Sequence, residues 1–332
     1  MSTTVAVTGA AGRVGRRVVR QLAQAGYQVR GLDRVRGSEA AHYVVGDIAD
    51  QRALAALLTG ADIVVHLAAL MSWVESDAAA LFDANVTGTF RLLEAVRAAG
   101  GAEIILASSG EVYPEMAPEY LPIDEDHPRR PRSHYGVTKL LDEDMVWFYA
   151  RRYDMPATVL RFPHTQDAAE LLDPCSDFSG PRFFLQPKLR QARGLGNAET
   201  VAVLEPHDDG QERLLLSRCP DGTPYQMPIG DTRDVATGVV AAVSRPQARG
   251  ESIALGPDQA DAFDVIVPRM SELTGLDYVD VEIPGAGPHY SVDISKARRV
   301  LGYDPAYPIG RMLDEAAAAY HQRQAAAASP RA

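Results

Sequence analysis

The feature that most constrains the fold is a glycine-rich stretch, TGAAGRVG, between an apolar run and a helical pattern at the start of the chain. Its glycines, Gly9, Gly12 and Gly15, follow the spacing GxxGxxG. Between a strand and a helix, such glycines permit a tight turn, a close approach to a pyrophosphate and tight helix–sheet packing. The N–H groups at the start of the helix favour phosphate. The stretch therefore predicts a dinucleotide-binding loop; the alternative is a turn with no ligand.

Short apolar runs alternate with helical patterns over about the first half of the chain. Runs such as IVVHL and EIILA are apolar at nearly every position, as in strands covered on both faces. The alternation predicts an α/β fold with a Rossmann-type, doubly wound parallel sheet. The expected strands are Thr4–Thr8, Gln28–Asp33, Tyr43–Val45, Ile63–Leu67, Glu103–Ala107 and Ala157–Arg161, and the expected helices are Arg13–Ala25, Asp50–Leu58, Ala78–Ala99 and Tyr135–Arg152.

The second half of the chain is richer in proline and glycine and predicts a smaller C-terminal α/β substrate domain. We expect short strands over Thr200–Pro228, with turns at residues 207–210 and 220–222. We divide the chain into a dinucleotide-binding domain (1–165, with return segments near 230–260), a mainly substrate-binding domain (166–325) and a flexible tail (326–332). Further helices are expected at Asp234–Val243, Phe263–Thr274, Ser295–Leu301 and Ile309–Gln324.

Charge and composition narrow the partners. The net charge of -11 argues against nucleic acid and against an anionic membrane surface. No run approaches the length of a membrane span, and the first residues lack a signal-peptide pattern. Cys175 and Cys219 form neither a disulfide framework nor a zinc pattern, so we expect a cytoplasmic protein. The basic patch of Arg129, Arg130 and Arg132 is interpreted as a solvated face.

Asp33 bears on the choice of dinucleotide. It ends the second expected strand, 24 residues after Gly9. A carboxylate there accepts hydrogen bonds from the adenosine ribose and repels a 2′-phosphate, which favours NAD over NADP. Arg34 and Arg36 follow directly and would suit the phosphate of NADP, which is the alternative.

A candidate catalytic group surrounds Tyr135. Tyr135 and Lys139 lie at i and i+4 on one helix, and Ser108 and Ser109 follow the fifth expected strand. A free tyrosine has a pKa near ~10, and a neighbouring ammonium lowers it towards the range useful for proton transfer. A serine hydroxyl can hold the substrate oxygen against the tyrosine. The alternative is a surface Tyr–Lys pair with no chemistry.

Together these motifs resemble an extended short-chain dehydrogenase/reductase of the NAD-dependent sugar epimerase/dehydratase family. The resemblance rests on TGAAGRVG, GLD, GDI, HLAA, NVTGT, ASSGEVYP and YGVTKL in residues 4–163, and more weakly on TRDVA and VDISKARRVLGY. It implies Ser109, Tyr135 and Lys139 as the catalytic residues. The cofactor-binding residues that it implies are Gly9, Gly12, Arg13, Val14, Gly15, Asp33, Asp47, Ile48, Leu67, Ala68, Ala69, Asn85, Tyr135, Lys139, Phe162 and Pro163.

The resemblance also implies a homodimer built on paired helices. The apolar positions of Ala78–Ala99 and Leu140–Tyr149 would supply that face, and burial inside one chain is the equal alternative.

Two departures from the family pattern concern the diphosphate of nucleotide sugars. Met227 stands near the position of one expected arginine, and residues 283–288 carry no cation where a second is usual. Bidentate arginine is the common way to hold phosphate, so a nucleotide-sugar substrate is disfavoured. Arg182, Lys188, Arg190 and Arg193 are possible substitutes, although a solvated helix is the favoured interpretation of that run.

Further candidate substrate residues are Ser108, Glu111, His164 and Arg182. Glu111 resembles the glutamate of the family's dehydratases, but Gly110 fills the slot of their aspartic acid, so dehydration is disfavoured. His164 is a candidate substrate contact or acid, with a packed or solvent-facing histidine as the alternative. His164, Asp173 and Cys175 lack metal-ligand spacing, and no metal is expected.

The expected activity is NAD-dependent chemistry at a carbinol or ketone carbon of a small, carbohydrate-like substrate. An epimerase, which oxidises and re-reduces the same carbon, is the first hypothesis. A net dehydrogenase or reductase of a non-nucleotide sugar, sugar acid or other hydroxy compound is the second. A catalytically silent NAD-sensing or scaffold protein is the third. Fold-level analogy alone carries the word "sugar".

Overall fold

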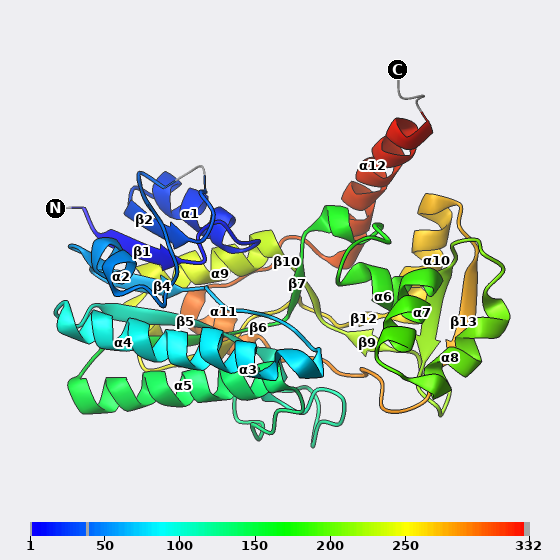
Figure 1. Ribbon diagram of the computed structural model, residues 1–332, viewed down its shortest axis with the longest axis horizontal. Helices are drawn as coiled ribbons and strands as arrows, with labels where there is room; N and C mark the ends of the chain where they lie inside the picture. The colour runs from blue at the N-terminus through cyan, green and yellow to red at the C-terminus, as the bar shows by residue number, and fades with distance from the viewer. Residues whose placement is uncertain (1, 38–39, 329–332) are drawn as a thin grey trace.

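The computed structural model describes residues 2–37 and 40–328. In these residues a parallel seven-stranded sheet forms the centre of the N-terminal region, which confirms the doubly wound α/β prediction (Figure 1). In sheet order, the strands are β3 (His42–Val45), β2 (Gln28–Asp33), β1 (Thr4–Thr8), β4 (Ile63–His66), β5 (Glu103–Ser109), β6 (Ala157–Phe162) and β11 (Ser252–Ala254). β11 comes from the second half of the chain and pairs with β6.

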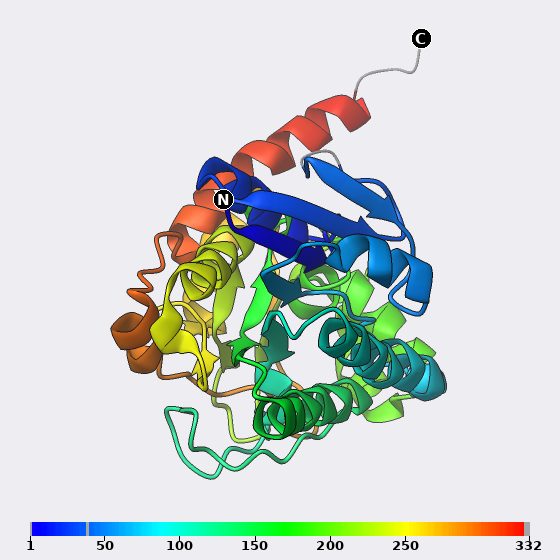
Figure 2. The same ribbon diagram turned by 90° about the vertical axis from the view of Figure 1, so that its left-hand side faces the viewer.

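Helices cover both faces of this sheet (Figure 2). Side chains alternate along a strand, so Val5 and Val7 of β1 pack in one apolar cluster and Ala6 packs in another on the opposite face. This two-sided burial is the reason that the strands are apolar at nearly every position. One face is covered by α1 (Gly15–Gln24), α9 (Thr232–Ser244) and α11 (Ser295–Leu301), and the other by α2 (Gln51–Leu58), α4 (Gly88–Ala98) and α5 (His134–Tyr153).

The expected helix at residues 78–99 is divided by a π-helical segment. α3 (Ala78–Leu81) leads into η2 (Phe82–Thr87), and α4 follows. π-Segments are rare and often lie at functional sites. Here Asn85 is buried, and its side-chain amide exchanges hydrogen bonds with the backbone N–H (2.7 Å) and C=O (2.9 Å) of Leu70. The segment therefore fixes the loop that follows β4.

The C-terminal region builds its own apolar core around Phe183, Phe263 and Met312. Its strands pair as β7 (His164–Gln166) with β10 (Ile229–Asp231), β8 (Leu214–Arg218) with β13 (Tyr278–Glu282), and β9 (Gln226–Met227) with β12 (Asp261–Ala262). Its helices are α6 (Ser179–Phe183), α7 (Leu185–Gly194), α8 (Ala198–Leu204), α10 (Phe263–Thr274) and α12 (Ile309–Ala328). The connections of the chain also contain the 3-10 helices η1 (Glu75–Asp77), η3 (Gly110–Val112), η4 (Ala168–Glu170), η5 (Glu205–His207) and η6 (Pro246–Ala248).

The prediction of strands over residues 200–228 is wrong at its start. Residues 200–204 belong to α8, because the side chain of Asn197 caps this helix by accepting a hydrogen bond from the Thr200 N–H (3.0 Å). The two predicted turns are confirmed, with Gly210 and Gly222 both at a φ of 82°. In the expected tail, residues 326–328 continue α12, and residues 329–332 lie outside the described residues.

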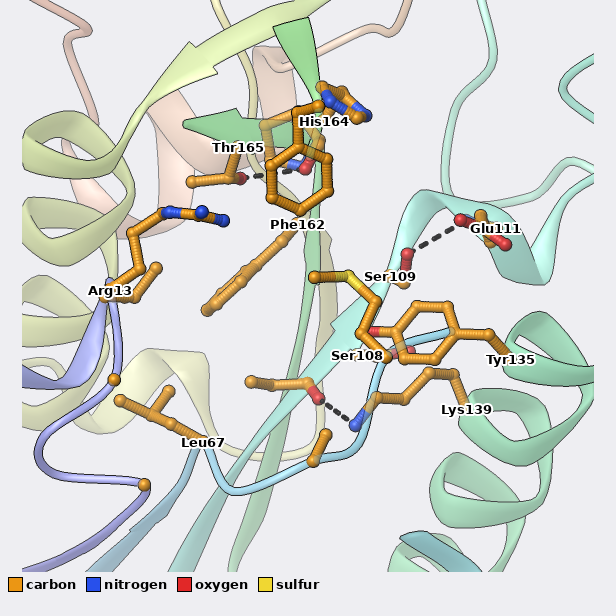
Figure 3. Close-up of a pocket in the computed structure, with 18 of the residues that line it drawn as sticks. Arg13, Leu67, Ser108, Ser109, Glu111, Tyr135, Lys139, Phe162, His164 and Thr165 are labelled. Carbon is orange, nitrogen blue, oxygen red and sulfur yellow. Dashed lines mark hydrogen bonds between the residues drawn. The ribbon is translucent and has the colours of Figure 1, made fainter. Parts of the chain in front are cut away.

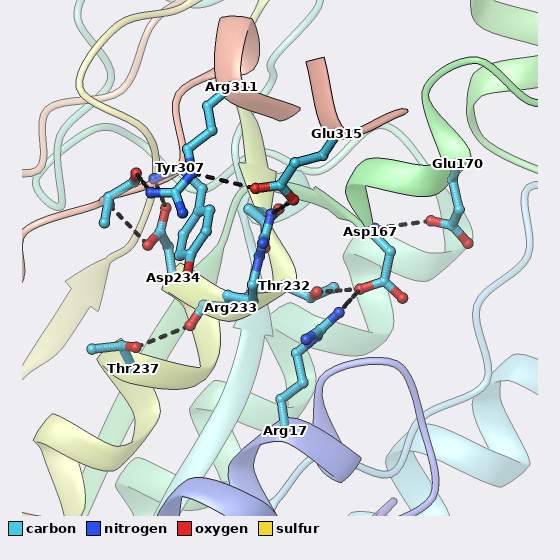
Figure 4. Close-up of polar contacts among 12 residues, drawn as sticks. Arg17, Asp167, Glu170, Thr232, Arg233, Asp234, Thr237, Tyr307, Arg311 and Glu315 are labelled. Carbon is cyan, nitrogen blue, oxygen red and sulfur yellow. Dashed lines mark hydrogen bonds and ion pairs between the residues drawn. The ribbon is translucent and has the colours of Figure 1, made fainter. Parts of the chain in front are cut away.

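Ion pairs join the glycine-loop helix α1 to the start of the C-terminal region (Figure 4). Arg17 binds Asp167 (2.7 Å), which also accepts a hydrogen bond from Thr232 at the start of α9. Arg13 binds Glu170 (2.8 Å). These contacts bring the C-terminal region against the mouth of the glycine loop.

Candidate active site

A cavity of about 260 Å³ lies at the carboxyl ends of β1, β4, β5 and β6 (Figure 3). Ligands in open α/β sheets bind at this edge. The glycine loop forms one wall, and Ser109, Tyr135 and Lys139 form another. The residues expected at the cofactor that line this cavity are Gly9, Gly12, Arg13, Val14, Gly15, Leu67, Ala69, Tyr135, Lys139, Phe162 and Pro163.

The glycine loop can be built only from glycine at two of its positions. Gly9 has a φ of +67°, and a Cβ there would lie 2.7 Å from the backbone nitrogen of Ala68. A Cβ on Gly15 would overlap the carbonyl oxygen of Gly9. The close approach of loop, helix and the segment after β4 is the arrangement that a dinucleotide cradle requires.

The remaining expected cofactor residues, Asp33, Asp47, Ile48, Ala68 and Asn85, are not among the residues that line this cavity. Asp33 accepts a hydrogen bond from the Ala11 N–H (3.0 Å), so its carboxylate also holds the glycine loop. Asp47 closes a local turn with the Ala49 N–H, and Ile48 is buried. Ala68 donates its N–H to Thr8 (3.2 Å), and Asn85 acts through the loop described above.

The catalytic residues predicted from the sequence lie together. Ser109 ends β5 and hydrogen-bonds Tyr135, which lies in the first turn of α5. Ser133 begins that helix by accepting a hydrogen bond from the Gly136 N–H (2.9 Å). One turn after Tyr135, the Nζ of Lys139 lies 5.9 Å from the centre of the tyrosine ring.

The expectation that Lys139 lowers the pKa of Tyr135 is wrong for this structure. Burial raises the pKa of Tyr135, and the carboxylates of Glu111 and Asp142 raise it further. The Nζ of Lys139 donates to the carbonyl of Ala107 (3.1 Å) and lies 3.5 Å from Asp142. The ammonium of Lys139 is therefore held by a carbonyl of β5 and by Asp142 of its own helix. Burial raises the pKa of Asp142 to about 6 against the opposing effect of Lys139, and no sequence motif marks this residue.

Ser108 is held by a buried ion pair beside the site. Its hydroxyl donates to Glu143 (2.6 Å), and Glu143 binds Arg161 through both carboxylate oxygens (2.9 and 2.8 Å). The proposed substrate contact of Ser108 is thereby weakened, although the residue borders the cavity. Glu111 accepts a hydrogen bond from Trp73 (2.9 Å), and burial raises the pKa of its carboxyl.

A second cavity of about 430 Å³ shares a wall with the first. Glu115 in that wall has its pKa raised to about 8, first by burial and then by the charge of Glu111. Its carboxyl lies where a side chain on Gly110 would otherwise project. The residues common to both cavities are Trp73, Glu111, Glu115, His164, Phe178 and Tyr290. Trp73, Glu115, Phe178 and Tyr290 were not selected from the sequence, because no motif there marks them.

The interpretation of two basic runs as solvated faces is wrong in part. Arg182 and Lys188 line the second cavity, because α6 and α7 fold around it, whereas Arg190 is exposed. Arg132 also borders this cavity. Its neighbour Arg129 instead binds Glu143 (3.1 Å) and Asp144 (3.0 Å), and Arg193 is exposed beside Glu205.

His164 is held beside Arg182. The guanidinium of Arg182 donates to the imidazole Nε2, which must therefore be unprotonated. Burial and the charges of Arg182 and Arg13 hold the pKa of His164 well below its usual range. A neutral histidine in this position does not favour the acid role considered for it.

Three comparisons place the chain among known proteins. A model of the NAD dependent epimerase/dehydratase family matches residues 5–166. A crystal structure of a short-chain dehydrogenase/reductase superfamily protein from Agrobacterium tumefaciens with bound NAD is 45% identical, superposes with a TM-score of 0.93, and aligns over 98% of this chain and 99% of that one. The chain belongs to the short-chain dehydrogenase/reductase superfamily. Within the superfamily it is an extended member and an NAD-dependent enzyme.

Two curated members of the superfamily differ in activity. A UDP-glucose 4-epimerase from Rhizobium meliloti is 28% identical over 97% of this chain and 98% of its own length. An L-arabinose 1-dehydrogenase (NAD(P)(+)) from Haloferax volcanii is 36% identical over 47% of this chain. The chain spans 65% of the length of that dehydrogenase.

The residues of the first cavity fit the cofactor of the superfamily. The glycine loop offers backbone N–H groups at the start of α1, and Asp33 lies beside that loop at the end of β2. Within residues 2–37 and 40–328, no three His, Cys, Asp or Glu side chains gather as metal ligands do. In that same part of the chain, no helix is long and apolar enough to cross a membrane.

Proposed function

We propose that this enzyme acts as an epimerase on a sugar or sugar-like substrate, oxidising a carbinol carbon transiently and reducing it again. The observation that carries the proposal is the meeting of Ser109, Tyr135 and Lys139 in one cavity with the glycine loop. The family model and the Rhizobium epimerase support it. Bound NAD would supply a reversible hydride acceptor in this cavity.

The proton transfers would run through Tyr135. During oxidation its phenolate takes the proton of the substrate hydroxyl as hydride leaves the adjoining carbon, and during reduction the phenol returns a proton to the carbonyl oxygen. The raised pKa of Tyr135 favours the protonated phenol, which is the form that the reduction step needs, whereas the oxidation step needs the phenolate. Ser109 would hold the substrate oxygen against the phenol. Lys139, whose ammonium lies 5.9 Å from the centre of the tyrosine ring, would be the nearby cation for the phenolate of the first step, although it does not lower the pKa of Tyr135 in this structure.

A net NAD-dependent dehydrogenase or reductase is the second candidate. The observation in its favour is that the second cavity is lined by Met227, near the position of one expected diphosphate-binding arginine, and by Pro288, which belongs to the cation-free stretch 283–288 where the second arginine is expected. The Haloferax dehydrogenase is a relative of this kind. An epimerase would convert substrate without net NADH, whereas a dehydrogenase would form one NADH for each substrate oxidised.

The substitution Tyr135→Phe tests the shared chemistry. It removes only the hydroxyl, so turnover should fall by at least about 100-fold while NAD binds with unchanged affinity. Turnover is followed by NADH absorbance and product chromatography, and NAD affinity by calorimetry. Tyr153→Phe, at the exposed far end of the same helix, is the matched control. If Tyr135→Phe turned over substrate as fast as the wild type, the role proposed for Tyr135 would fail. A wild type that binds NAD but converts none of the compounds tested would favour a silent NAD-sensing protein.

We also propose a homodimer and a cytoplasmic location. Large apolar side chains are exposed along neighbouring helices α4 and α5, including Phe90 (48% exposed) and Phe148 (50%). Other apolar side chains on the same helices, such as Leu92 and Val146, are buried in the chain's own core. Part of each helix therefore serves the core, and the exposed part remains available for a dimer face. The thiols of Cys175 and Cys219 are free, in keeping with a reducing compartment.

A further inference from the structure

Two cations are enclosed in the second cavity without an ion-pair partner. Arg182 lies in α6 and Lys188 in α7, and the fold of these adjoining helices brings both side chains to one wall. Among the described residues, no carboxylate pairs with either of them, although many arginines elsewhere in the chain are paired. Enclosed cations without a counter-charge are costly, and proteins usually pair them.

Arg182 is held in place by neutral groups. Its guanidinium donates to the side-chain oxygen of Gln166 (3.1 Å) and to the imidazole of His164. Gln166 is buried, and its amide nitrogen donates in turn to Ser179 (2.9 Å), which orients its oxygen towards the arginine. These contacts leave N–H groups of the guanidinium available for a ligand, because five are present.

Lys188 lies close to the positively charged guanidinium of Arg182. Burial lowers the pKa of Lys188, and the charge of Arg182 lowers it further. Burial also lowers the pKa of Arg182 itself, to about 10. The ammonium of Lys188 donates to Gln191 (3.0 Å), which leaves two of its three protons free. An anion between the two side chains would remove the repulsion.

The rest of the cavity sets the charge of that anion. Asp177 and Arg132, both exposed in the lining, carry opposite charges, and Glu111 adds a carboxyl to the same lining. Glu115 has a pKa of about 8 and is mostly protonated at neutral pH. Arg182 and Lys188 are the two enclosed cations of this lining, and the acidic side chain of Glu111 in the same lining opposes a second negative charge on the ligand. The cavity therefore matches a single carboxylate better than the doubly charged diphosphate of a nucleotide sugar.

We propose that the second cavity binds the carboxylate of a sugar acid, held by Arg182 and Lys188, while the substrate carbinol reaches Tyr135. His164, which touches Arg182 and lines both cavities, places this anion site beside the reacting carbon, as one monosaccharide acid requires. The assignment of the carbinol rests on the function proposed above; the assignment of the carboxylate rests on the cavity alone.

The test compares binding of matched acid and neutral compounds to the NAD-saturated protein by calorimetry and thermal shift. The pairs are D-glucuronate with D-glucose, D-galacturonate with D-galactose, and D-gluconate with D-glucitol, and UDP is tested separately. We expect an acid to bind at least about tenfold more tightly than its neutral partner. Arg182→Gln should weaken the binding of that acid by about 30-fold or more, because it removes one partner of an enclosed charge pair.

Arg190→Gln is the matched control, because Arg190 is exposed on the same helix α7 as Lys188. It should leave acid binding within about twofold. Unchanged NAD affinity in Arg182→Gln shows that the variant is folded; if it does not fold, Lys188→Gln takes its place with the same expectation.

Equal effects of the acid and neutral members of every pair, including no effect of either, would overturn the proposal. So would acid binding that survives both substitutions, or UDP binding that Arg182→Gln abolishes, since the anion would then be a diphosphate. Acid binding that depends on Arg182, without conversion of any compound, would retain the anion site and reject the proposed function instead.

Discussion

Glu111 and Glu115 show how position sets the charge of a residue in this site. Both carboxyls border the two cavities, but Glu111 accepts hydrogen bonds from Trp73 and Ser133, which oppose the effect of its burial. Glu115 has one such partner, Tyr290, and its pKa rises to about 8 because burial and the charge of Glu111 outweigh that bond. Two carboxyls in one site that ionise over different pH ranges can present both a proton donor and an acceptor.

Glu115 should make stability fall as pH rises. Its pKa is higher in the folded chain (about 8) than the ordinary value of 4.5, so the folded state binds its proton more tightly. This contribution is fully present below pH 4.5 and is lost as pH rises towards and through 8. Glu115→Gln should therefore flatten the decline of the unfolding free energy across this window, measured by urea denaturation at a series of pH values. Glu119→Gln, on an exposed residue nearby, is the control; equal slopes for Glu115→Gln and wild type would contradict the prediction.

At the scale of elements, one buried ion pair joins helix α5 to strands β5 and β6. Arg161 on β6 binds Glu143 on α5, and Glu143 accepts the hydroxyl of Ser108 on β5. Arg161 also contacts Tyr113 and the carbonyl of Glu125 (3.2 Å), so its donors are satisfied. The pair fixes the distance between the strand that carries Ser109 and the helix that carries Tyr135.

Arg161→Met should destabilise the protein by about 3–5 kcal/mol, because it leaves the carboxylate of Glu143 buried with only the partly exposed Arg129 as a cation. Urea denaturation measures the loss. Arg298→Met breaks the surface pair with Asp258, in which both side chains are about half exposed, and should cost less than about 1 kcal/mol. Similar losses in the two variants would show that the buried pair has no special role.

At the scale of the whole molecule, the exposed apolar side chains of α4 and α5 are the expected dimer surface. Phe90 and Phe148 lie on helices that run side by side along one face of the sheet (Figure 1). If two chains pair there, a charge on each of these residues must be buried unpaired on association. The double variant Phe90→Glu, Phe148→Glu should sediment as one chain where the wild type sediments as two. Val265→Glu, at an exposed position of α10, should leave the wild-type mass unchanged, and a wild-type monomer would contradict the prediction.

Whether a feature of the site could be predicted depends on how far apart in the chain its residues lie. β1 and β2 have the predicted bounds, and the glycine loop, Ser109, Tyr135 and Lys139 share one cavity as expected. These features depend on the spacing of neighbouring residues and on the periodicity of side chains along a strand or helix, and both can be followed in the sequence. The π-helical segment η2 was missed, because its apolar pattern is that of an ordinary helix and only the bonds of Asn85 to Leu70 reveal its effect.

The sequence by itself determined six of the seven strands of the sheet, the cofactor loop and the spacing of Tyr135 and Lys139, because each of these features lies within a short segment, whereas β11 was not predicted. Tertiary structure alone decided where charge lies. It turned Lys139 towards Ala107 and Asp142, put the carboxyl of Glu115 beside Gly110, and enclosed Arg182 with Lys188. The physical reason is that a pKa or an ion pair depends on burial and on side chains far away in the chain, which no local pattern specifies.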